Sequence, residues 1–231
     1  MLFAIKYQEQ RILLSNLINA DSKILYNRSP RERVAKVAPW LTLDGDPYPS
    51  IVDGKVMWII DGYTTSAGYP YSQTTSLSTA TADALTANST SITAQTNTKV
   101  NYIRNSVKAT VDAYNGTVTL YQWDEKDPVL ATWMKAFPGT VTPKSKMSAQ
   151  LLEHIRYPED LFRVQREVLS SYHVKTADAF YGGQDFWRVP RDPSTFGANA
   201  GAQPPYYMTV QMPGAKTPAS VSYTHLRAHE T

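Results

Sequence analysis

Acidic side chains are the first candidates for chemistry in this sequence. The run Asp44-Gly45-Asp46 is followed by Asp53 and Asp61, and carboxylate oxygens are ligands that Ca²⁺ prefers. The spacing does not match an EF-hand loop, which alternates its ligands and places a glutamate at its twelfth position. Turn formation beside Pro47 and Pro49 accounts for these residues on its own, so the sequence assigns no metal ligand.

A second acidic pair, Glu159-Asp160, directly follows Pro158. Carboxylates in the first turn of a helix complement the helix dipole, which explains the pair without a catalytic role. The alternative is an envelope hydrolase or glycan-binding module that uses Asp44, Asp46 or Glu159. A hydrolase would require these carboxylates to converge at roughly 5–10 Å across a groove. We assign no catalytic residue.

The histidines give little support for metal or base chemistry. His154 and His173 are nineteen residues apart, without metal-ligand spacing, and the other two, His225 and His229, lie in the last eleven residues. Neither a Gly-x-Ser-x-Gly nucleophile motif nor a glycine-rich phosphate loop occurs in the sequence. We therefore predict no metal and no cofactor.

Basic and aromatic residues offer two further binding interpretations. A basic group is formed by Arg28, Arg31, Arg33 and Lys36. It could contact anionic lipid headgroups or wall phosphates, although a solvated helix face with Glu32 interleaved explains it better. A glycan platform could use the five tryptophans with the tyrosine-rich loops, but core packing is the ordinary role of such scattered aromatics. The tryptophans are Trp40, Trp58, Trp123, Trp133 and Trp187.

Composition excludes several classes of protein. The 231 residues are 42% hydrophobic and 19% charged, which is a globular composition. The absence of cysteine excludes disulfides, cysteine-ligated zinc and a cysteine nucleophile. Lys+Arg 23 against Asp+Glu 20 is too balanced for an electrostatic nucleic-acid binder. No apolar run approaches the roughly 20 residues of a bilayer span, and the N-terminus has no signal-peptide pattern.

The elements that would position these residues are short helices and hairpins. Asp53-Gly54 and Asn115-Gly116 predict hairpins over residues 49–64 and 106–123. For the second segment a helix competes, because Ile103, Val107 and Val111 repeat every four residues, but the alternation continues past the turn and favours the hairpin. A last strand is expected near residues 206–212. The fold class is therefore α+β, loop-rich, with antiparallel β-hairpins packed against short helices.

Helix starts are marked by capping residues. Ser29 followed by Pro30 and Glu32 predicts a helix to about residue 38, and Asp127-Pro128 predicts another. Helices are also expected over residues 2–18 and 148–156 and from Pro158 onwards. In the last of these, one apolar face is expected to pack on a core; it consists of Leu161, Val164, Val168 and Tyr172.

Residues 72–98 separate an N-terminal part, residues 1–71, from a larger part, residues 99–220. In this stretch 14 of 27 residues are Ser or Thr and the one charged residue is Asp83. So few large apolar side chains predict an exposed loop or linker, with O-glycosylation or cell-wall contact as alternatives. Whether the two flanking parts share one core is left open by the sequence.

The last eleven residues have an unusual sequence. Residues 221–231 read VSYTHLRAHET, which matches one translated frame of a transposon sequencing adapter. We therefore expect them to be an artefact and not part of the native fold, and we expect the native chain to continue beyond about residue 220. Without them the chain retains His154 and His173 alone.

Several blocks in order resemble one bacterial family. Residues 26–28 and 30–34 read YNR and PRERV, and residues 37–49 read VAPWLTLDGDPYP. Further blocks are DGYTTS at 61–66, YPYS at 69–72, VNYIRNSVKA at 100–109, YPEDLF at 157–162 and PPYY at 204–207. This succession, which covers nearly all of residues 1–220, is similar to the membrane proteins of uncharacterised protein family 0182.

The resemblance implies a location more than an activity. Members of that family have N-terminal membrane spans followed by a large extracytoplasmic region, and no catalytic residue is carried over from them. The chain is therefore expected to be a fragment of the extracytoplasmic region, held at the cell membrane through spans outside this sequence. A role in envelope assembly, transport or interaction with envelope or protein partners follows as an expectation, and no nucleic-acid partner is expected.

Overall fold

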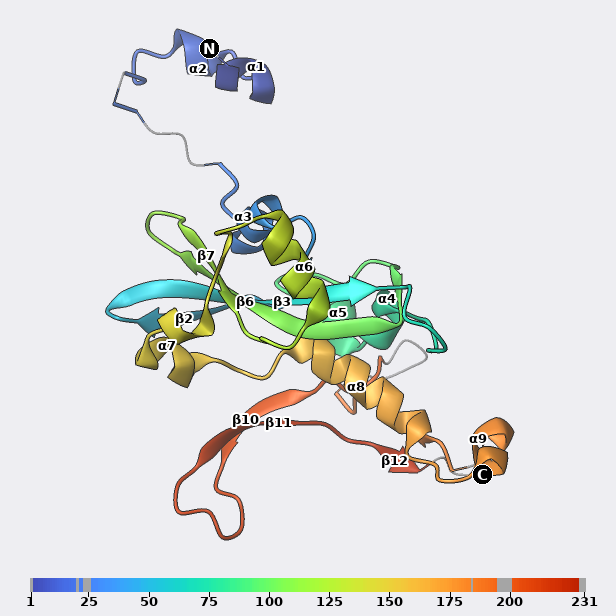
Figure 1. The fold of residues 1–231 in the computed structure, drawn as a ribbon. Helices are drawn as coiled ribbons and strands as arrows, with labels where there is room; N and C mark the ends of the chain where they lie inside the picture. Colours follow the sequence, from blue (N-terminus) through green and yellow to red (C-terminus); the bar gives the residue numbers. More distant parts are fainter. Residues whose placement is uncertain (1, 20, 23–25, 184, 195–200, 229–231) are drawn as a thin grey trace.

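A six-stranded sheet forms the centre of the molecule in the computed structural model, which describes residues 2–19, 21–22, 26–183, 185–194 and 201–228. Its order is β1-β3-β6-β7-β8, with β2 also paired to β3; all pairs are antiparallel except β7 with β8 (Figure 1). The strands are β1 Thr42–Leu43, β2 Tyr48–Val52, β3 Lys55–Ser66, β6 Tyr102–Asp112, β7 Val118–Gln122 and β8 Val141–Thr142. The predicted α+β class is confirmed.

Both predicted hairpins occur in the sheet. Asp53 and Gly54 have φ values of 50° and 75° between β2 and β3, as a type I′ turn requires. β6 pairs antiparallel with β7, from Val107 with Gln122 to Val111 with Val118, and Gly116 has a φ of 74° in the turn between them, so residues 106–123 form a hairpin and not the competing helix. The Asp112 side chain stabilises the turn of this hairpin, because it accepts hydrogen bonds from the amides of Tyr114 and Asn115.

Helices cover both faces of the sheet (Figure 1). α3 and α6 pack on one face, where Val34 and Leu130 join Ile60, Val107 and Leu120 in the larger core cluster. α7 packs on the other face in a smaller core cluster. The bounds are α3 Pro30–Val37, α6 Pro128–Ala136, α7 Ala149–His154, α8 Glu159–Tyr172 and α9 Ala177–Gly182. Since β3 and β6 are neighbours, residues 1–71 and 99–220 contribute to one sheet and one core.

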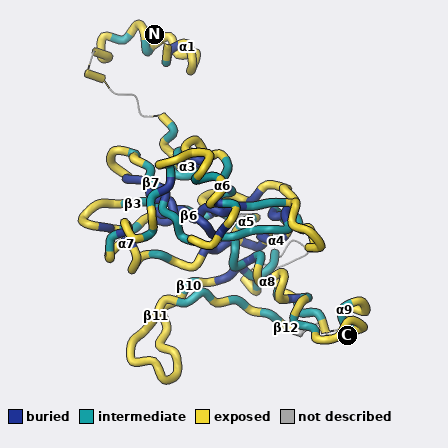
Figure 2. Tube along the Cα trace, in the orientation of Figure 1, coloured by how far each residue is buried: buried dark blue, intermediate teal, exposed yellow. Residues whose placement is uncertain are grey.

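The predicted helix over residues 2–18 is broken. α1 spans Leu2–Tyr7 and α2 spans Arg11–Leu14. The break falls at Gln8, whose φ of 52° is incompatible with a continuous right-handed helix. Figure 2 shows this segment as a largely exposed arm away from the sheet.

The Ser/Thr-rich stretch is not an exposed linker. It contains β4 Thr75–Ser76, α4 Leu77–Ala80 and α5 Ala84–Asn88, and it ends at β5 Lys99–Val100, which pairs with β4. Leu77 and Asp83 are buried. The expectation fails because short polar side chains cap the small helices and because the one charged side chain of this stretch, Asp83, is paired with Arg163.

α8 buries the opposite face from the one expected. Its buried residues are Glu159, Asp160, Arg163, Arg166 and Ser170. Of the predicted apolar stripe, Val168 and Tyr172 are 50% and 52% exposed. The reason is electrostatic, because the charged face of α8 meets buried partners that satisfy it, as described below.

The remaining strands lie outside the central sheet. β10 Tyr206–Val210, the strand expected near residues 206–212, pairs with β11 Ala219–Tyr223, and β9 Trp187–Arg188 pairs with β12 Arg227–Ala228. The adapter origin of residues 221–231 concerns the gene and stays a prediction; residues 229–231 lie outside the described part. Within that part, no helix combines the length and apolar character needed to cross a bilayer.

Candidate functional site

The loop after β1 binds the N-terminus of α8 through Asp44. The buried carboxylate of Asp44 accepts hydrogen bonds at Oδ2 from the Tyr63 hydroxyl and from the Asp160 amide, the latter at 3.0 Å. Its Oδ1 accepts from the Asp46 amide at 2.9 Å. Burial, then the charges of Asp160 and Asp61, raise the pKa of Asp44. Asp44 therefore joins the loop after β1 to the first turn of α8.

Asp160, in the first turn of α8, makes the reciprocal contact with the loop after β1. Its Oδ2 accepts from the Gly45 amide at 2.9 Å and from Gln95 Nε2 at 2.6 Å. Gln95 also donates to the Leu43 carbonyl at 2.8 Å. The space is tight, because a Cβ on Gly45 would lie 2.4 Å from the Thr93 carbonyl oxygen. These hydrogen bonds join three segments that are distant in the sequence: residues 43–45, Gln95 and the start of α8.

Arg163 lies at the centre of what we call the charged cluster, which consists of Asp44, Asp83, Glu159, Asp160 and Arg163. The Arg163 side chain is 0% exposed. Nε donates to Asp83 Oδ2 at 2.6 Å, and the two terminal nitrogens lie 3.0 Å from Asp160 Oδ1 and 2.5 Å from Glu159 Oε1. The Glu159 contact is an ion pair without hydrogen-bond alignment, since neither atom has a hydrogen-bond partner.

Glu159 is the member of the charged cluster whose pKa is raised to about 7. Burial is the largest cause that raises its pKa to about 7, opposed by the charge of Arg163 and supported by the charges of Asp46 and Asp160. Asp46 shares a hydrogen bond with Glu159, and burial raises the pKa of Asp46 as well. A carboxyl pair with raised pKa values is a feature found in acid–base catalysis, so its accessibility decides its role.

The second buried charge pair crosses the sheet between β3 and β6. Lys108 Nζ contacts Asp61 Oδ1 and donates to the Arg156 carbonyl at 3.1 Å, and the Lys108 side chain is 0% exposed. Asn105 Nδ2 also donates to Asp61 Oδ1, at 3.1 Å. Burial is the main cause that raises the pKa of Asp61, with Lys108 opposing it. The pair ties the sheet to the segment between α7 and α8.

The structure therefore brings three of the predicted carboxylates together. Asp44, Asp46 and Glu159 meet at the start of α8 and engage one another or neighbouring backbone. Asp53 lies apart at the β2–β3 turn, where its amide donates to Gln150 Oε1. Among the described residues no group of three or more His, Asp or Glu could hold a metal ion. The four clefts with described linings include none of Asp44, Asp46 and Glu159.

The basic group divides between structural and surface roles. Arg31 donates to the carbonyls of Leu43 and Asp44 at 3.3 and 3.2 Å, and Arg33 donates to that of Gly116 at 3.1 Å. Lys36 forms an exposed ion pair with Glu32 at 3.3 Å. Two of the four cations therefore hold loops in place and do not form a continuous basic face.

Among the residues that the structure describes, the histidines and tryptophans do not assemble into a site. His154 and His173 each contact a backbone carbonyl of their own helix, and His173 stacks on Trp187 at 3.7 Å. Trp40 and Trp133 stack at 5.4 Å beside the core. Trp123 differs, because it lines an open cleft.

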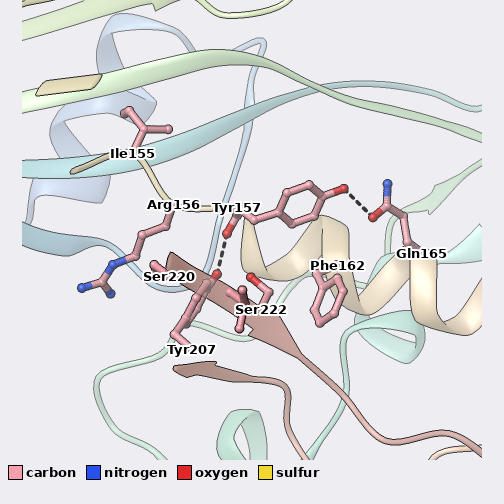
Figure 3. Close-up of a pocket in the computed structure, with 9 residues that line it drawn as sticks. Ile155, Arg156, Tyr157, Phe162, Gln165, Tyr207, Ser220 and Ser222 are labelled. Carbon is pink, nitrogen blue, oxygen red and sulfur yellow. Dashed lines mark hydrogen bonds between the residues drawn. The ribbon is translucent and has the colours of Figure 1, made fainter. Parts of the chain in front are cut away.

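That cleft, which we call the sheet cleft, has a volume of ≈ 590 Å³ and lies between β6, the end of β7 and the α7–α8 connection. The lining residues used below are Arg104, Lys108, Trp123, Asp124, Tyr157 and Gln165. A neighbouring cleft of ≈ 420 Å³ shares Arg156, Tyr157 and Gln165 (Figure 3). Figure 3 also shows the Tyr157 hydroxyl directed at Gln165 and the Tyr207 hydroxyl directed at the Tyr157 carbonyl.

The sequence did not identify Lys108, Arg163, Asp83 or Gln95 as site residues. Lys108, Thr110 and Asp112 alternate with apolar residues in a pattern typical of a solvated strand face, yet all three are buried. One signal in the sequence did indicate this burial. β3 is apolar on both faces, which is typical of a sheet covered on both faces, and the polar side chains of the neighbouring strand β6 are then buried as well.

These features define an α+β domain with a charged interior and an aromatic-lined cleft. The chain belongs to the uncharacterised protein family UPF0182, whose model matches residues 1–230. It is similar to a UPF0182 protein of Thermobifida fusca, at 58% identity over 218 residues, which covers 94% of this chain and 21% of that protein. It is also similar to a UPF0182 protein of Kineococcus radiotolerans, at 57% identity over 234 residues, which covers 99% of this chain and 23% of that protein.

A UPF0182 protein of Streptomyces coelicolor is 56% identical over 219 residues, covering 94% of this chain and 22% of that protein. The chain thus spans about a fifth of the length of these curated relatives. The expected family membership is confirmed, and the relatives' greater length agrees with a fragment of a larger protein. No solved structure matches the chain.

Proposed function

We propose that this chain is an extracytoplasmic portion of a bacterial integral membrane protein, with a non-catalytic role in envelope assembly, transport or interaction. The length of the relatives supports the proposal, because the chain spans about a fifth of it and the remainder can supply membrane spans. This role implies two kinds of partner. One is the cell membrane, reached through such spans, and the other is envelope or protein components.

The non-catalytic part of the proposal is supported by the contacts of the clustered carboxylates, which are bound to neighbouring protein groups. A general acid or nucleophile must reach its substrate. Asp44 and Asp160 are buried and hydrogen-bonded to backbone amides, and Glu159 lies against Arg163. This geometry suits carboxylates that hold a loop, a helix and a connecting segment together.

Topology reporters test the location. The full-length gene is expressed with alkaline phosphatase, which needs disulfides formed outside the cytoplasm, inserted at the exposed turn around Gly214. A matched fusion carries a fluorescent protein that matures in the cytoplasm. We expect phosphatase activity without fluorescence. Fluorescence without phosphatase activity would place this region in the cytoplasm and overturn the proposal.

A further inference from the structure

The sheet cleft combines a substantial volume with reachable polar and aromatic side chains. Its ≈ 590 Å³ falls within the roughly 300–1,000 Å³ typical of small-ligand sites. We propose that it binds a neutral oligosaccharide. The inference deepens the proposed function by naming the chemical class of an envelope partner, and it rests on that function for the source of the sugar.

Planar polar groups at the cleft can pair with sugar hydroxyls. Arg104 and Asp124 form an ion pair at 2.6 Å, and their side chains remain 38% and 24% exposed. Gln165 accepts the Tyr157 hydroxyl at Oε1, at 2.5 Å, which fixes its amide and leaves Nε2 as a donor on an exposed side chain. A guanidinium group has five N–H donors and a carboxylate about four lone-pair positions, so Arg104 and Asp124 keep hydrogen-bonding capacity beyond the contact between them.

Aromatic rings supply the apolar complement. Tyr157 is 45% exposed and its ring orientation is fixed by edge contact with Phe162 and by the Gln165 hydrogen bond. Trp123 is half-buried, and Lys144 Nζ lies 3.8 Å from its ring centroid. Amphipathic rings of this kind bury apolar area while keeping a polar edge wet, which suits the C–H faces of a pyranose.

The charge balance favours a neutral ligand over an anionic one. Arg104 is compensated by Asp124, and Lys108 by Asp61. Arg156 packs over the Tyr48 ring at 4.5 Å and is attracted to Asp46. An anion would have to compete with these internal partners.

Backbone geometry disfavours an extended peptide. A peptide that joins a sheet needs a free strand edge, but β7 pairs with β6 along its whole length and with β8 at Leu120 and Tyr121. In the α7–α8 connection, the Arg156 amide donates to the Tyr48 hydroxyl and its carbonyl accepts from Lys108. The proposal also leaves out the neighbouring cleft of Figure 3, because Val221 and Ser222 in its wall belong to the predicted adapter segment.

The test is an NMR titration of the ¹⁵N-labelled 231-residue chain that follows the indole resonance of Trp123, assigned with Trp123→Phe. The probes are maltotriose, cellotriose, N,N′,N″-triacetylchitotriose and a tetraglutamate peptide. We expect at least one trisaccharide to shift this resonance saturably. Tyr157→Ala should weaken that binding about tenfold and Gln165→Ala about fivefold. Tyr114→Ala, at a 98% exposed tyrosine in the β6–β7 turn, should change it less than twofold.

The proposal is overturned if no trisaccharide shifts the Trp123 resonance, or if the folded Tyr157→Ala and Gln165→Ala variants both retain full affinity. Stronger binding of tetraglutamate than of every trisaccharide would assign the cleft to an acidic peptide instead. Binding in solution does not depend on where the region lies in the cell. Failure here is therefore distinguishable from failure of the topology reporters.

Discussion

Lys108 illustrates, at the scale of a residue, how this fold depends on paired charges. Its ammonium group is completely buried against Asp61 and the Arg156 carbonyl. Desolvation of two ions offsets much of their attraction, so such a pair contributes little net stability. Removing one partner is different, because the other is left buried and uncompensated.

Lys108→Met should therefore lower the free energy of unfolding by about 3–5 kcal/mol. The double variant Lys108→Met/Asp61→Leu should recover most of that loss, since no unpaired charge remains. Urea denaturation of the wild type, both single variants and the double variant measures the coupling. A Lys108→Met variant within about 1 kcal/mol of the wild type would contradict a buried ion pair.

Glu159 makes the stability depend on pH in a defined direction. Its pKa is about 7 in the folded chain, above the ordinary value of 4.5, so the folded state binds the proton more tightly. Its contribution is fully present below about pH 4.5 and is lost as the pH rises through 7. The loss is at most about 3.5 kcal/mol, because each pKa unit corresponds to about 1.4 kcal/mol.

Glu159→Gln isolates this effect, because every other ionisable residue is the same in both proteins. The unfolding free energy of the wild type should fall relative to the variant between pH 5 and pH 8. Chemical denaturation at intervals across this range gives the difference curve. A difference that rises with pH would reverse the assigned direction of the pKa shift.

Residue types alone pointed to Asp44, Asp46 and Glu159, and the structure does bring them together. The sequence could not assign their role, because the partners that bury them are remote. Asp83 reaches Arg163 across 80 residues, and Gln95 reaches Asp160 across 65. Pairings over such separations leave no local periodicity.

At the scale of elements, the contact between the β1–β2 loop and α8 depends on Gly45. Gly45→Ala places a Cβ 2.4 Å from the Thr93 carbonyl oxygen. Backbone must then shift, which should cost about 1–3 kcal/mol. Gly68→Ala is the matched control, since its nearest neighbour would be Ser66 Oγ at 3.6 Å. Thermal unfolding should separate the two variants, and equal melting temperatures would contradict the tight packing.

Elements fixed by local signals could be predicted, whereas those fixed by remote partners could not. Ser29 and Asp127 cap α3 and α6 as expected, and both glycine turns form hairpins. The same reasoning failed for α8, because hydrophobic periodicity assumes that the apolar face is buried. There the ion pairs of Arg163 bury the polar face instead.

At the scale of the whole molecule, the chain spans about a fifth of the length of its curated relatives. Its two flanking parts share one sheet, and the Ser/Thr-rich stretch is anchored to α8 through Asp83 and Gln95. The composition suggested a linker because few large apolar residues occur there. Buried polar contacts replace the missing apolar contacts.

The central claim, an extracytoplasmic location, is tested most directly by cysteine labelling in the full-length protein. This chain contains no cysteine, so Tyr114→Cys introduces a single thiol into it at a position that is 98% exposed. Intact cells are treated with a membrane-impermeant maleimide, with the unsubstituted protein as the control. We predict equal labelling of Tyr114→Cys in intact and lysed cells, and labelling that appears only after lysis would contradict the account.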